Sequence, residues 1–407
     1  MKRRSFLRSA GLGGAALAIP VAAKAAAIPP MKITRVRFYQ NPLSRPMVNQ
    51  SSHIVTVETD AGITGIGEGG SPDLIKQLAP LIIGEDPARI SHLWQLMFRG
   101  YFYPPGRELI HALGAIDLAL WDIKGKALGV PVHDLLGGTA RDHIECYATS
   151  YPDKGSLKET ARACIEAGFR AFRWHGIDPE EGKGYNSHVA VRKAHEGCIQ
   201  IREAVGKDGD WAIDFHTRYD FPDAVRLCTL IEPLEPYFVE DLIRSENPGV
   251  YRQLRPQVKV PIAVGEHFGP RWDQNELIEG RLIDYARVSI PNCGGITEYV
   301  KIASMCETHY VGLIPHFTGP LAEAPLVQVC AVFPGPVLME MVGDSKPPAI
   351  SHLPECYDFR NGKMWPNRRP GLGVTLDTKP LKLMAEVTEH AQPIPLLRRP
   401  DGSITNW

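Results

Sequence analysis

Short apolar runs alternate with longer amphipathic segments from about residue 144 to residue 341. The runs have the length of buried strands, and the segments between them repeat apolar positions with a helical period. This alternation predicts a parallel sheet closed into a βα barrel. Eight candidate strands occur, the number that closes a barrel filled by side chains: IECYAT, RAFRWH, WAIDFH, YFVED, PIAVGE, YARVSI, VGLIPHF and PVLMEM. The clearest helical segments between them are 156–167, 188–205, 222–234 and 297–308.

The preceding segment, residues 31–140, has the pattern of an α+β domain. Two alternating runs, KITRVRFYQ and HIVTVETD, predict strands, and a turn at 60–62 leads into a third, ITGIGEG. Helical periodicity follows and is strongest in 109–128, which is apolar on most sides and predicts a buried helix. Two acids of that helix, Asp117 and Asp122, are expected to pair with neighbouring basic side chains rather than to do chemistry.

Three of the predicted barrel strands end in an acid, Asp214, Glu240 and Glu266, at equal intervals of 26 residues. One interval is about one strand plus one helix, so the three carboxylates should emerge at the same C-terminal mouth. A single acid after a strand is usually a helix cap or a surface charge. Three in register fit the oxygen ligands that a hard cation such as Mg²⁺ requires, and we expect them to bind it.

Further groups able to transfer protons or bind anions stand at the other predicted strand ends. A single histidine there is usually a structural, hydrogen-bonded residue. Several histidines near a divalent ion suit proton transfer, because imidazole titrates near neutral pH. The insertion at 176–188 is polar and lies on the mouth side, so it should contribute to the pocket. The strand-end candidates are Arg173, His175, His216, His267, His316 and Glu340.

Composition and charge narrow the class of protein. The 407 residues carry a formal net charge of −1, which argues against nucleic acid or an anionic membrane as the main partner. No apolar run after the N-terminal segment is long enough to span a bilayer. The eight cysteines form no C-x-x-C pair, so we expect small buried hydrophobes rather than a disulfide framework or a zinc site.

Residues 1–30 have the composition of an export signal. Lys2, Arg3 and Arg4 precede Ser-Phe-Leu and a Gly- and Ala-rich stretch, and residues 23–25 offer a small-x-small cleavage site. The paired arginines resemble a twin-arginine signal, and the weak hydrophobicity of the stretch favours that reading. A plain secretory signal or a basic tail is the alternative. The expected location is the periplasm, which a folded, metal-loaded protein could reach by this route.

The order of the strand-end residues resembles the enolase superfamily, in its mandelate racemase/muconate lactonising enzyme branch. The stretch ALWDIKGKALGVPVHDLLGG is similar to the capping-domain helix of that branch. The stretches CGGITE and GLGV are similar to its usual sequence motifs. The resemblance covers residues 31 to 380. It implies a modified TIM barrel (residues 141–349) with an α+β capping domain (31–140) and a C-terminal segment (350–407) that returns to the capping domain.

The resemblance also implies a reaction. Mg²⁺ held by Asp214, Glu240 and Glu266 binds a substrate carboxylate, a base removes the proton alpha to it, and the metal stabilises the resulting enediolate. A carbon acid of this kind is too weak for a side-chain base in water, so the negative charge needs preorganised compensation. Glu340 should contact the carboxylate or enediolate and be protonated or shared with a neighbour; its alternative role is a partner for a nearby base.

The sequence departs from the simplest pattern of the branch. Arg173-Trp174-His175 stands where racemases have Lys-x-Lys, so no lysine base is available. Ser289 replaces the aspartate expected ahead of CGGIT, so His316 lacks the carboxylate that would raise its pKa and fix its tautomer.

Other positions are similar to the acid-sugar dehydratases of the branch. His216 matches a histidine of galactonate, gluconate and mannonate dehydratases. Tyr185 with Arg173 resembles the Arg–Tyr pair of mannonate dehydratases, and His175 and His267 resemble positions of rhamnonate dehydratases.

We therefore expect a Mg²⁺-dependent sugar-acid dehydratase, a lyase that acts as a homo-oligomer. His216, or Tyr185 with Arg173, would remove the C2 proton, and His316 would protonate the departing 3-hydroxyl to give a 2-keto-3-deoxy acid. The capping-domain loop 42–52 should close over the mouth, with Arg45 and Asn49 selecting the sugar. Arg45 is equally compatible with a solvated surface charge.

Two other functions are compatible with parts of the pattern. A racemase, epimerase or cycloisomerase on the same scaffold needs two opposed bases and expels no hydroxyl, so it would exchange the C2 proton with solvent without forming a keto acid. A non-catalytic periplasmic acid-sugar binding protein would bind without exchange, but simple binding does not need so many titratable groups.

The export signal can be tested by its arginine pair. Replacing Arg3 and Arg4 by lysine should leave the protein in the cytoplasm, because twin-arginine recognition depends on that pair. Cell fractionation with immunoblotting checks this, with Arg8→Lys as the matched control that should still be exported. Equal export of the double variant and the control would contradict the twin-arginine reading.

Overall fold

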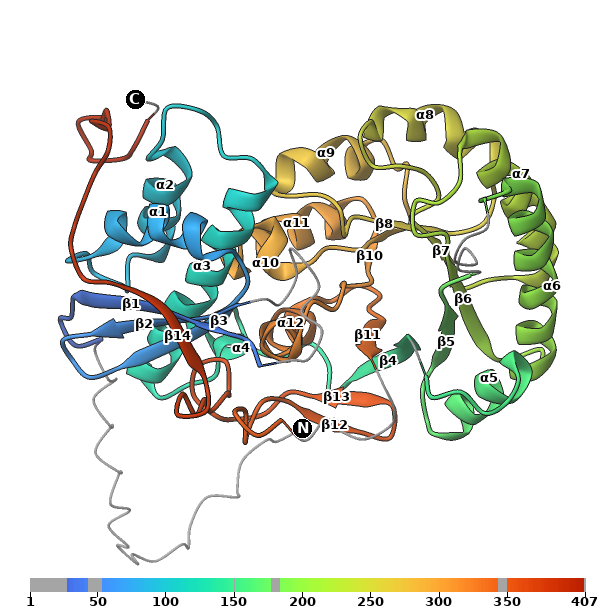
Figure 1. Ribbon diagram of the computed structural model, residues 1–407, viewed down its shortest axis with the longest axis horizontal. Coiled ribbons are helices and arrows are strands. Elements are labelled where there is room, and N and C mark those ends of the chain that lie inside the picture. Colours follow the sequence, from blue (N-terminus) through green and yellow to red (C-terminus); the bar gives the residue numbers. More distant parts are fainter. Residues whose placement is uncertain (1–27, 43–52, 150, 177–183, 343–349, 406–407) are drawn as a thin grey trace, which may run out of the picture.

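The computed structural model describes residues 28–42, 53–149, 151–176, 184–342 and 350–405. Figure 1 shows a smaller lobe with an antiparallel sheet beside a larger lobe in which helices surround strands. The two lobes correspond to the two patterns that the sequence predicts. None of the helices in these ranges is long and apolar enough to cross a membrane.

The smaller lobe is the capping domain, and its sheet has the order β14-β1-β2-β3. Valine, isoleucine and phenylalanine side chains of β1 and β2 face the helices and are buried. Strand β14 comes from the C-terminal segment and pairs antiparallel with β1, so this segment returns to the capping sheet. The elements are β1 (Ile33–Gln40), β2 (His53–Thr59), β3 (Thr64–Glu68), β14 (Lys382–Val387), α1 (Pro72–Ile82), α2 (Ile90–Arg99), α3 (Arg107–Leu128) and α4 (Val132–Leu135).

The larger lobe contains the barrel strands, each of which overlaps one of the eight predicted runs. They are β4 (Ile144–Thr149), β5 (Ala171–Trp174), β6 (Asp210–Asp214), β7 (Phe238–Glu240), β8 (Ile262–Val264), β9 (Tyr285–Ala286), β10 (Gly312–Leu313) and β11 (Met339–Val342). Neighbours from β4 to β10 pair parallel in sequence order, and β11 pairs parallel with β4. A parallel bridge between Leu313 and Val337 closes the ring. The predicted barrel with a capping domain is thus confirmed.

Capping side chains and a proline explain where several helices around the barrel begin and end. Ser156 and Asn186 cap α5 and α6 by accepting the N–H of the third residue of the helix. The predicted helix 222–234 is α7 followed by a 3₁₀ turn, because Pro233 cannot continue the α-helical hydrogen bonds. The elements are α5 (Leu157–Glu166), α6 (Ser187–Val205), α7 (Phe221–Ile231), α8 (Tyr251–Leu254), α9 (Arg271–Glu279), α10 (Ile290–Cys293), α11 (Ile296–Thr308), α12 (Pro320–Val332) and the 3₁₀ helices Glu232–Leu234, Pro248–Val250 and Arg255–Gln257.

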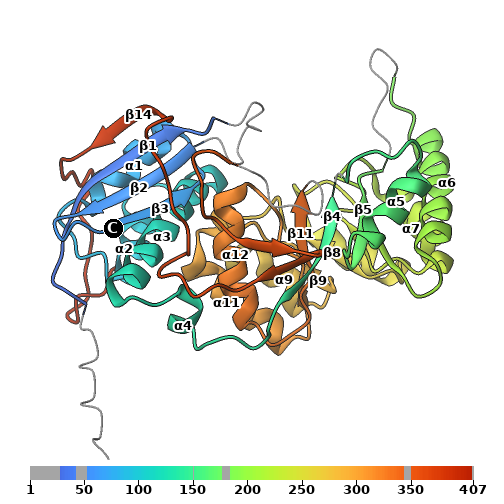
Figure 2. The same ribbon diagram turned by 90° about the horizontal axis from the view of Figure 1, so that it is seen from below.

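The segment after the barrel leads the chain back across it. The hairpin of β12 (Asp358–Arg360) and β13 (Lys363–Trp365) turns at Asn361 and Gly362, both with positive φ, as two-residue hairpins favour. Strand β13 pairs antiparallel with β4, and Figure 2 shows this hairpin beside α12 and β4. From there the chain continues to β14 on the capping sheet.

Two buried acids of α3 connect the parts of the molecule. Asp122 accepts the side chain of Lys126 and the backbone N–H groups of Ile66 and Leu372, at 2.6–3.0 Å. The expected basic partner of Asp122 is therefore confirmed.

Asp117 has a different partner from the expected one. Its Oδ2 accepts the backbone N–H of Thr297, 3.0 Å away, in the first turn of α11. A carboxylate complements the unsatisfied N–H groups at a helix N-terminus, which explains why no basic side chain is needed. The contact joins the capping domain to the barrel.

An aromatic column also crosses the interface between the domains. The rings of Trp94 and Phe98 stack with centroids 4.8 Å apart, and Phe98 stacks on Trp272 of α9 at 5.2 Å. Lys301 lies over Trp94 and Arg271 lies over Trp272, and both cations pair with the buried Glu298. Stacking and cation–π contacts therefore hold the capping domain on the barrel at a second place.

Asp117 makes stability depend on pH in a defined direction. Burial raises its pKa from 3.8 to about 7, so the folded protein binds this proton more tightly than the unfolded chain. As pH rises from 3.8 to about 7, wild-type stability should fall relative to Asp117→Asn, and above that range the difference should be constant. Melting temperatures of the two proteins across this range measure it. Asp134→Asn, at a more exposed site, is the control; a pH-independent difference for Asp117→Asn would contradict the assignment.

Candidate active site

The three predicted metal ligands lie at the carboxyl ends of adjacent strands. Asp214 ends β6 and pairs in register with Glu240, which ends β7. Glu266 follows β8 by two residues. All three side chains are buried, with at most 7% of their surface exposed. Carboxylates this deeply buried need compensating positive charge.

Arg173, at the predicted strand-two position, supplies part of that charge. Its Nη1 donates to Asp214 Oδ2 at 3.0 Å, and its Nη2 donates to Glu340 Oε1 at 2.8 Å. Its Nε lies 3.4 Å from Glu240 Oε2, and neither atom has a hydrogen-bond partner among the described residues. The guanidinium therefore connects two of the three predicted ligands to Glu340, an acid within β11.

A second arginine, Arg287, lies in the same cluster and is fully buried. Its Nε contacts Glu240 Oε1 and lies 3.2 Å from Glu266 Oε2. Its Nη2 donates to Glu340 Oε2 at 2.7 Å, and its Nη1 donates to the hydroxyl of Tyr147 at 2.7 Å. Sequence reasoning missed this residue. The available signal was a charged residue inside the apolar run YARVSI, since an arginine in a barrel strand requires buried partners.

Glu340 is shared between the two arginines. Burial opposes ionisation, but Arg287 and Arg173 outweigh it and lower the pKa of Glu340. The backbone N–H of Phe317 also donates to its Oε2 at 2.8 Å. Glu340 was expected to be protonated or shared with a neighbour, and here one guanidinium holds each of its two oxygens.

His316 lies on the loop after β10 and is buried. Its Nδ1 is 2.6 Å from the hydroxyl of Ser289, the residue that replaces the expected aspartate. Its Nε2 lies 3.6 Å from Glu266 Oε2. Burial lowers the pKa of His316 in spite of the opposing field of Glu266, which favours a neutral imidazole.

His216 and His267 approach Glu266 from its other oxygen. His216 has a left-handed backbone, with φ of 49°, and its N–H donates to Asp214 Oδ1 at 2.6 Å. Its half-exposed ring places Nε2 3.9 Å from Glu266 Oε1. His267 Nε2 lies 3.3 Å from the same oxygen, and that hydrogen bond raises the pKa of His267. The two rings meet edge to face at 6.4 Å.

One group of potential metal ligands within the described residues is tighter than the predicted trio. Asp241, Glu266 and His267 each place a ligand atom within 4.8 Å of the others. Asp241 was not predicted, and its Oδ2 is buried with no hydrogen-bond partner in the described chain. The buried acceptor atoms Glu240 Oε2 and Asp241 Oδ2 both fit a bound cation, which would supply the missing partner. Glu266 belongs to both sets.

Of the remaining predicted residues, Tyr185 and His175 both form hydrogen bonds with Arg218. Tyr185 is 47% exposed, and its hydroxyl donates to the backbone carbonyl of Arg218 at 3.2 Å. Arg173 is paired with carboxylates, so no hydrogen bond joins it to Tyr185. Arg218 also donates to the backbone carbonyl of His175 at 2.5 Å. The predicted lid residues Arg45 and Asn49 lie outside the described residues.

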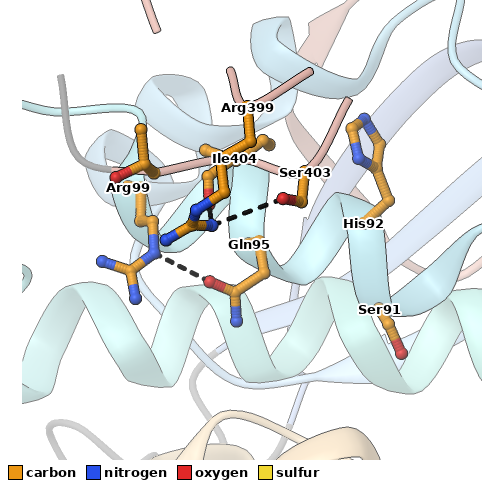
Figure 3. A pocket seen from close by; sticks show the side chains of 8 residues that line it. Ser91, His92, Gln95, Arg99, Arg399, Ser403 and Ile404 are labelled. Atoms are coloured by element: carbon orange, nitrogen blue, oxygen red, sulfur yellow. Dashed lines mark hydrogen bonds between the residues drawn. The ribbon is translucent and has the colours of Figure 1, made fainter. Parts of the chain in front are cut away.

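A separate cavity of about 570 Å³ lies between α2 and the C-terminal segment (Figure 3). Its lining includes Arg99 and Arg399 but none of the strand-end residues of the barrel. Within the cavity Arg99 donates to Gln95, and Arg399 donates to Ser403 (Figure 3). The acids and histidines described above thus belong to a different part of the molecule.

Comparison with protein families matches both domains. Residues 32–137 match the mandelate racemase/muconate lactonizing enzyme N-terminal domain, and residues 156–380 match the enolase C-terminal domain-like family. A D-galactonate dehydratase of Xanthomonas oryzae pv. oryzae is 37% identical over 392 residues, covering 93% of this chain and all of the relative. A D-galactonate dehydratase of Pectobacterium atrosepticum is 36% identical with the same coverage.

Solved structures agree with this result. A putative dehydratase from Salmonella enterica serovar Typhimurium has a TM-score of 0.81 at 27% identity, covering 88% of this chain and all of that one. A putative galactarate dehydratase from Agrobacterium radiobacter, bound to Na and L-malate, has a TM-score of 0.76 at 29% identity, covering 92% of this chain and 99% of that one.

Because Glu266 belongs to both candidate ligand sets, its removal should prevent binding of a divalent ion to either. For Glu266→Gln we expect Mg²⁺ affinity to fall by about a hundredfold or more, roughly 2.8 kcal/mol. Isothermal titration calorimetry measures this, with Glu279→Gln on the exposed side of α9 as the control. Unchanged Mg²⁺ binding by Glu266→Gln would remove both sets from consideration.

Proposed function

The chain belongs to the mandelate racemase/muconate lactonizing enzyme family of the enolase superfamily, and on that premise we propose that it is a Mg²⁺-dependent sugar-acid dehydratase. The observation that carries the proposal is the cluster of buried carboxylates at the barrel mouth with histidines on both sides of Glu266. A hydro-lyase needs this combination, because it must stabilise an enediolate, accept one proton and donate another. The D-galactonate dehydratases among the relatives support the same reaction class.

Asp214, Glu240 and Glu266 are the residues we propose to hold Mg²⁺. When bound, the ion supplies a positive charge that polarises the substrate carboxylate and makes the neighbouring C–H bond more acidic. Glu240 Oε2 supports this assignment, because it is buried and accepts no hydrogen bond from the described residues, and a bound cation would satisfy it.

Arg173 is suited to bind the negative end of the substrate. Its Nε is a buried donor without a hydrogen-bond partner among the described residues, 3.4 Å from the orphan oxygen of Glu240. An anionic oxygen placed here would satisfy Arg173 Nε, while a cation would satisfy Glu240 Oε2. We propose that Arg173 stabilises the substrate carboxylate and the developing enediolate. In this proposal it does not act together with Tyr185 as the general base.

The two histidines are suited to opposite roles. We propose that His316 accepts the C2 proton, because its buried ring is kept neutral and its Nδ1 is fixed by Ser289. His216 then donates a proton to the departing 3-hydroxyl from its half-exposed position near Glu266. This reverses the roles expected from the sequence. Loss of water leaves an enol, which becomes the 2-keto-3-deoxy acid.

The substrate class follows from the relatives and the chemistry of the site. A substrate needs a carboxylate, a proton on C2 and a leaving hydroxyl on C3, which hexonates, pentonates and aldarates all provide. The D-galactonate dehydratases make D-galactonate the first sugar acid to test.

Product formation and proton exchange together test the reaction. Purified protein with Mg²⁺ should form a 2-keto-3-deoxy acid from one or more sugar acids, detected with semicarbazide, and Glu240→Gln should form none. In D₂O, His316→Asn should lose deuterium incorporation at C2, whereas His216→Asn should keep exchange and lose product. Exchange without keto acid in the wild type would indicate a racemase or epimerase. Full activity of Glu240→Gln would contradict the ligand assignment.

A further inference from the structure

Arg287 is a positively charged side chain located beside the proposed binding site of a divalent metal ion. It follows β9 directly, its backbone N–H donates to the carbonyl of Val264 in β8, and its side chain is fully buried. Its Nε faces Glu240 and Glu266, which are two of the three proposed ligands of the divalent ion. A fixed positive charge therefore lies against two of the carboxylates that the ion would use.

Glu340 counteracts this charge. Its two carboxylate oxygens lie 2.7 Å from Arg287 Nη2 and 2.8 Å from Arg173 Nη2. Tyr147 binds the remaining Nη1 of Arg287 at 2.7 Å. Arg287 cannot move away from the ligands without breaking these contacts, and each guanidinium nitrogen has an acceptor.

We propose that Arg287 is a positioning residue that aligns Glu240 and Glu266 and limits their affinity for the divalent ion, with Glu340 acting in the opposite direction. The arginine neutralises the carboxylates when the ion is absent, and the ion competes with it when present. Glu340 draws the guanidinium toward β11 and adds negative charge to the site. This inference rests on the proposed metal-dependent function.

The charges predict opposite effects for two substitutions. Removing the positive charge in Arg287→Met should tighten Mn²⁺ binding by about tenfold or more, because like-charge repulsion and competition for Glu240 and Glu266 disappear. Removing the negative charge in Glu340→Gln should weaken Mn²⁺ binding by about fivefold or more. A loss of stability alone would not move the two affinities in opposite directions.

Isothermal titration calorimetry with Mn²⁺ measures both affinities, and melting temperatures with and without EDTA give a second readout. The ion should raise the melting temperature of Arg287→Met more than that of the wild type. Arg141→Met is the matched control, because Arg141 donates to the backbone carbonyls of Phe333 and Gly335 and to none of the proposed ligands. It should lower stability without changing Mn²⁺ affinity.

Weaker or unchanged binding by Arg287→Met, or tighter or unchanged binding by Glu340→Gln, would overturn the inference. If Arg287→Met does not fold, Glu340→Gln decides alone by the same criterion. A wild-type protein that binds no divalent ion and turns over no sugar acid would instead refute the proposed function. Normal wild-type binding and turnover with no opposite shifts would refute only the role of Arg287.

Discussion

Charge compensation among buried carboxylates is the interaction on which the site depends. Asp214, Glu240, Glu266 and Glu340 lie together at the barrel mouth, where each would be costly to ionise alone. Arg173 and Arg287 cross-link them, so that four acids share two fixed cations. Two guanidiniums cannot compensate four carboxylates, so a divalent ion would supply the positive charge that keeps all four ionised.

The fold places the acids and the histidines together, because the barrel strands and the loops that follow them end at the same rim. Parallel strands bring the acids to one rim in register, and the loops after them bring His216, His267 and His316. The capping domain is held on the barrel through Asp117 at the start of α11 and through the column of Trp94, Phe98 and Trp272. The mouth can therefore hold strained residues such as His216 while the interface carries the stability.

The sequence was sufficient for the barrel, the capping domain and the strand-end acids. The equal spacing of Asp214, Glu240 and Glu266 reports strand register directly, because each βα unit has a similar length. The same pattern could not reveal Asp241 or Arg287. Asp241 follows a predicted ligand and reads as part of the same acidic pair, and Arg287 lies inside a run that periodicity assigns to the apolar barrel interior.

Side-chain partners were also beyond the reach of spacing. Glu340 was expected to be protonated or shared with a neighbour, but the two arginines that share it could not be named, because they come from strands distant in sequence. The positions of Tyr185 and Arg173 in the sequence resemble those of a catalytic Arg–Tyr pair, but the hydroxyl of Tyr185 donates to the backbone carbonyl of Arg218. The hydrogen-bond partner of a side chain depends on which donors and acceptors lie near it in the folded protein. The periodicity of a single sequence does not show this.

The position of the bound ion tests the central claim most directly. Crystals grown with Mn²⁺ and measured at a wavelength where manganese scatters anomalously would locate it without reference to the surrounding side chains. The account predicts one peak within ligand distance of Asp214, Glu240 and Glu266, beside Arg173. A peak held by Asp241 and His267 without Asp214 and Glu240, or no peak at the barrel mouth, would contradict it.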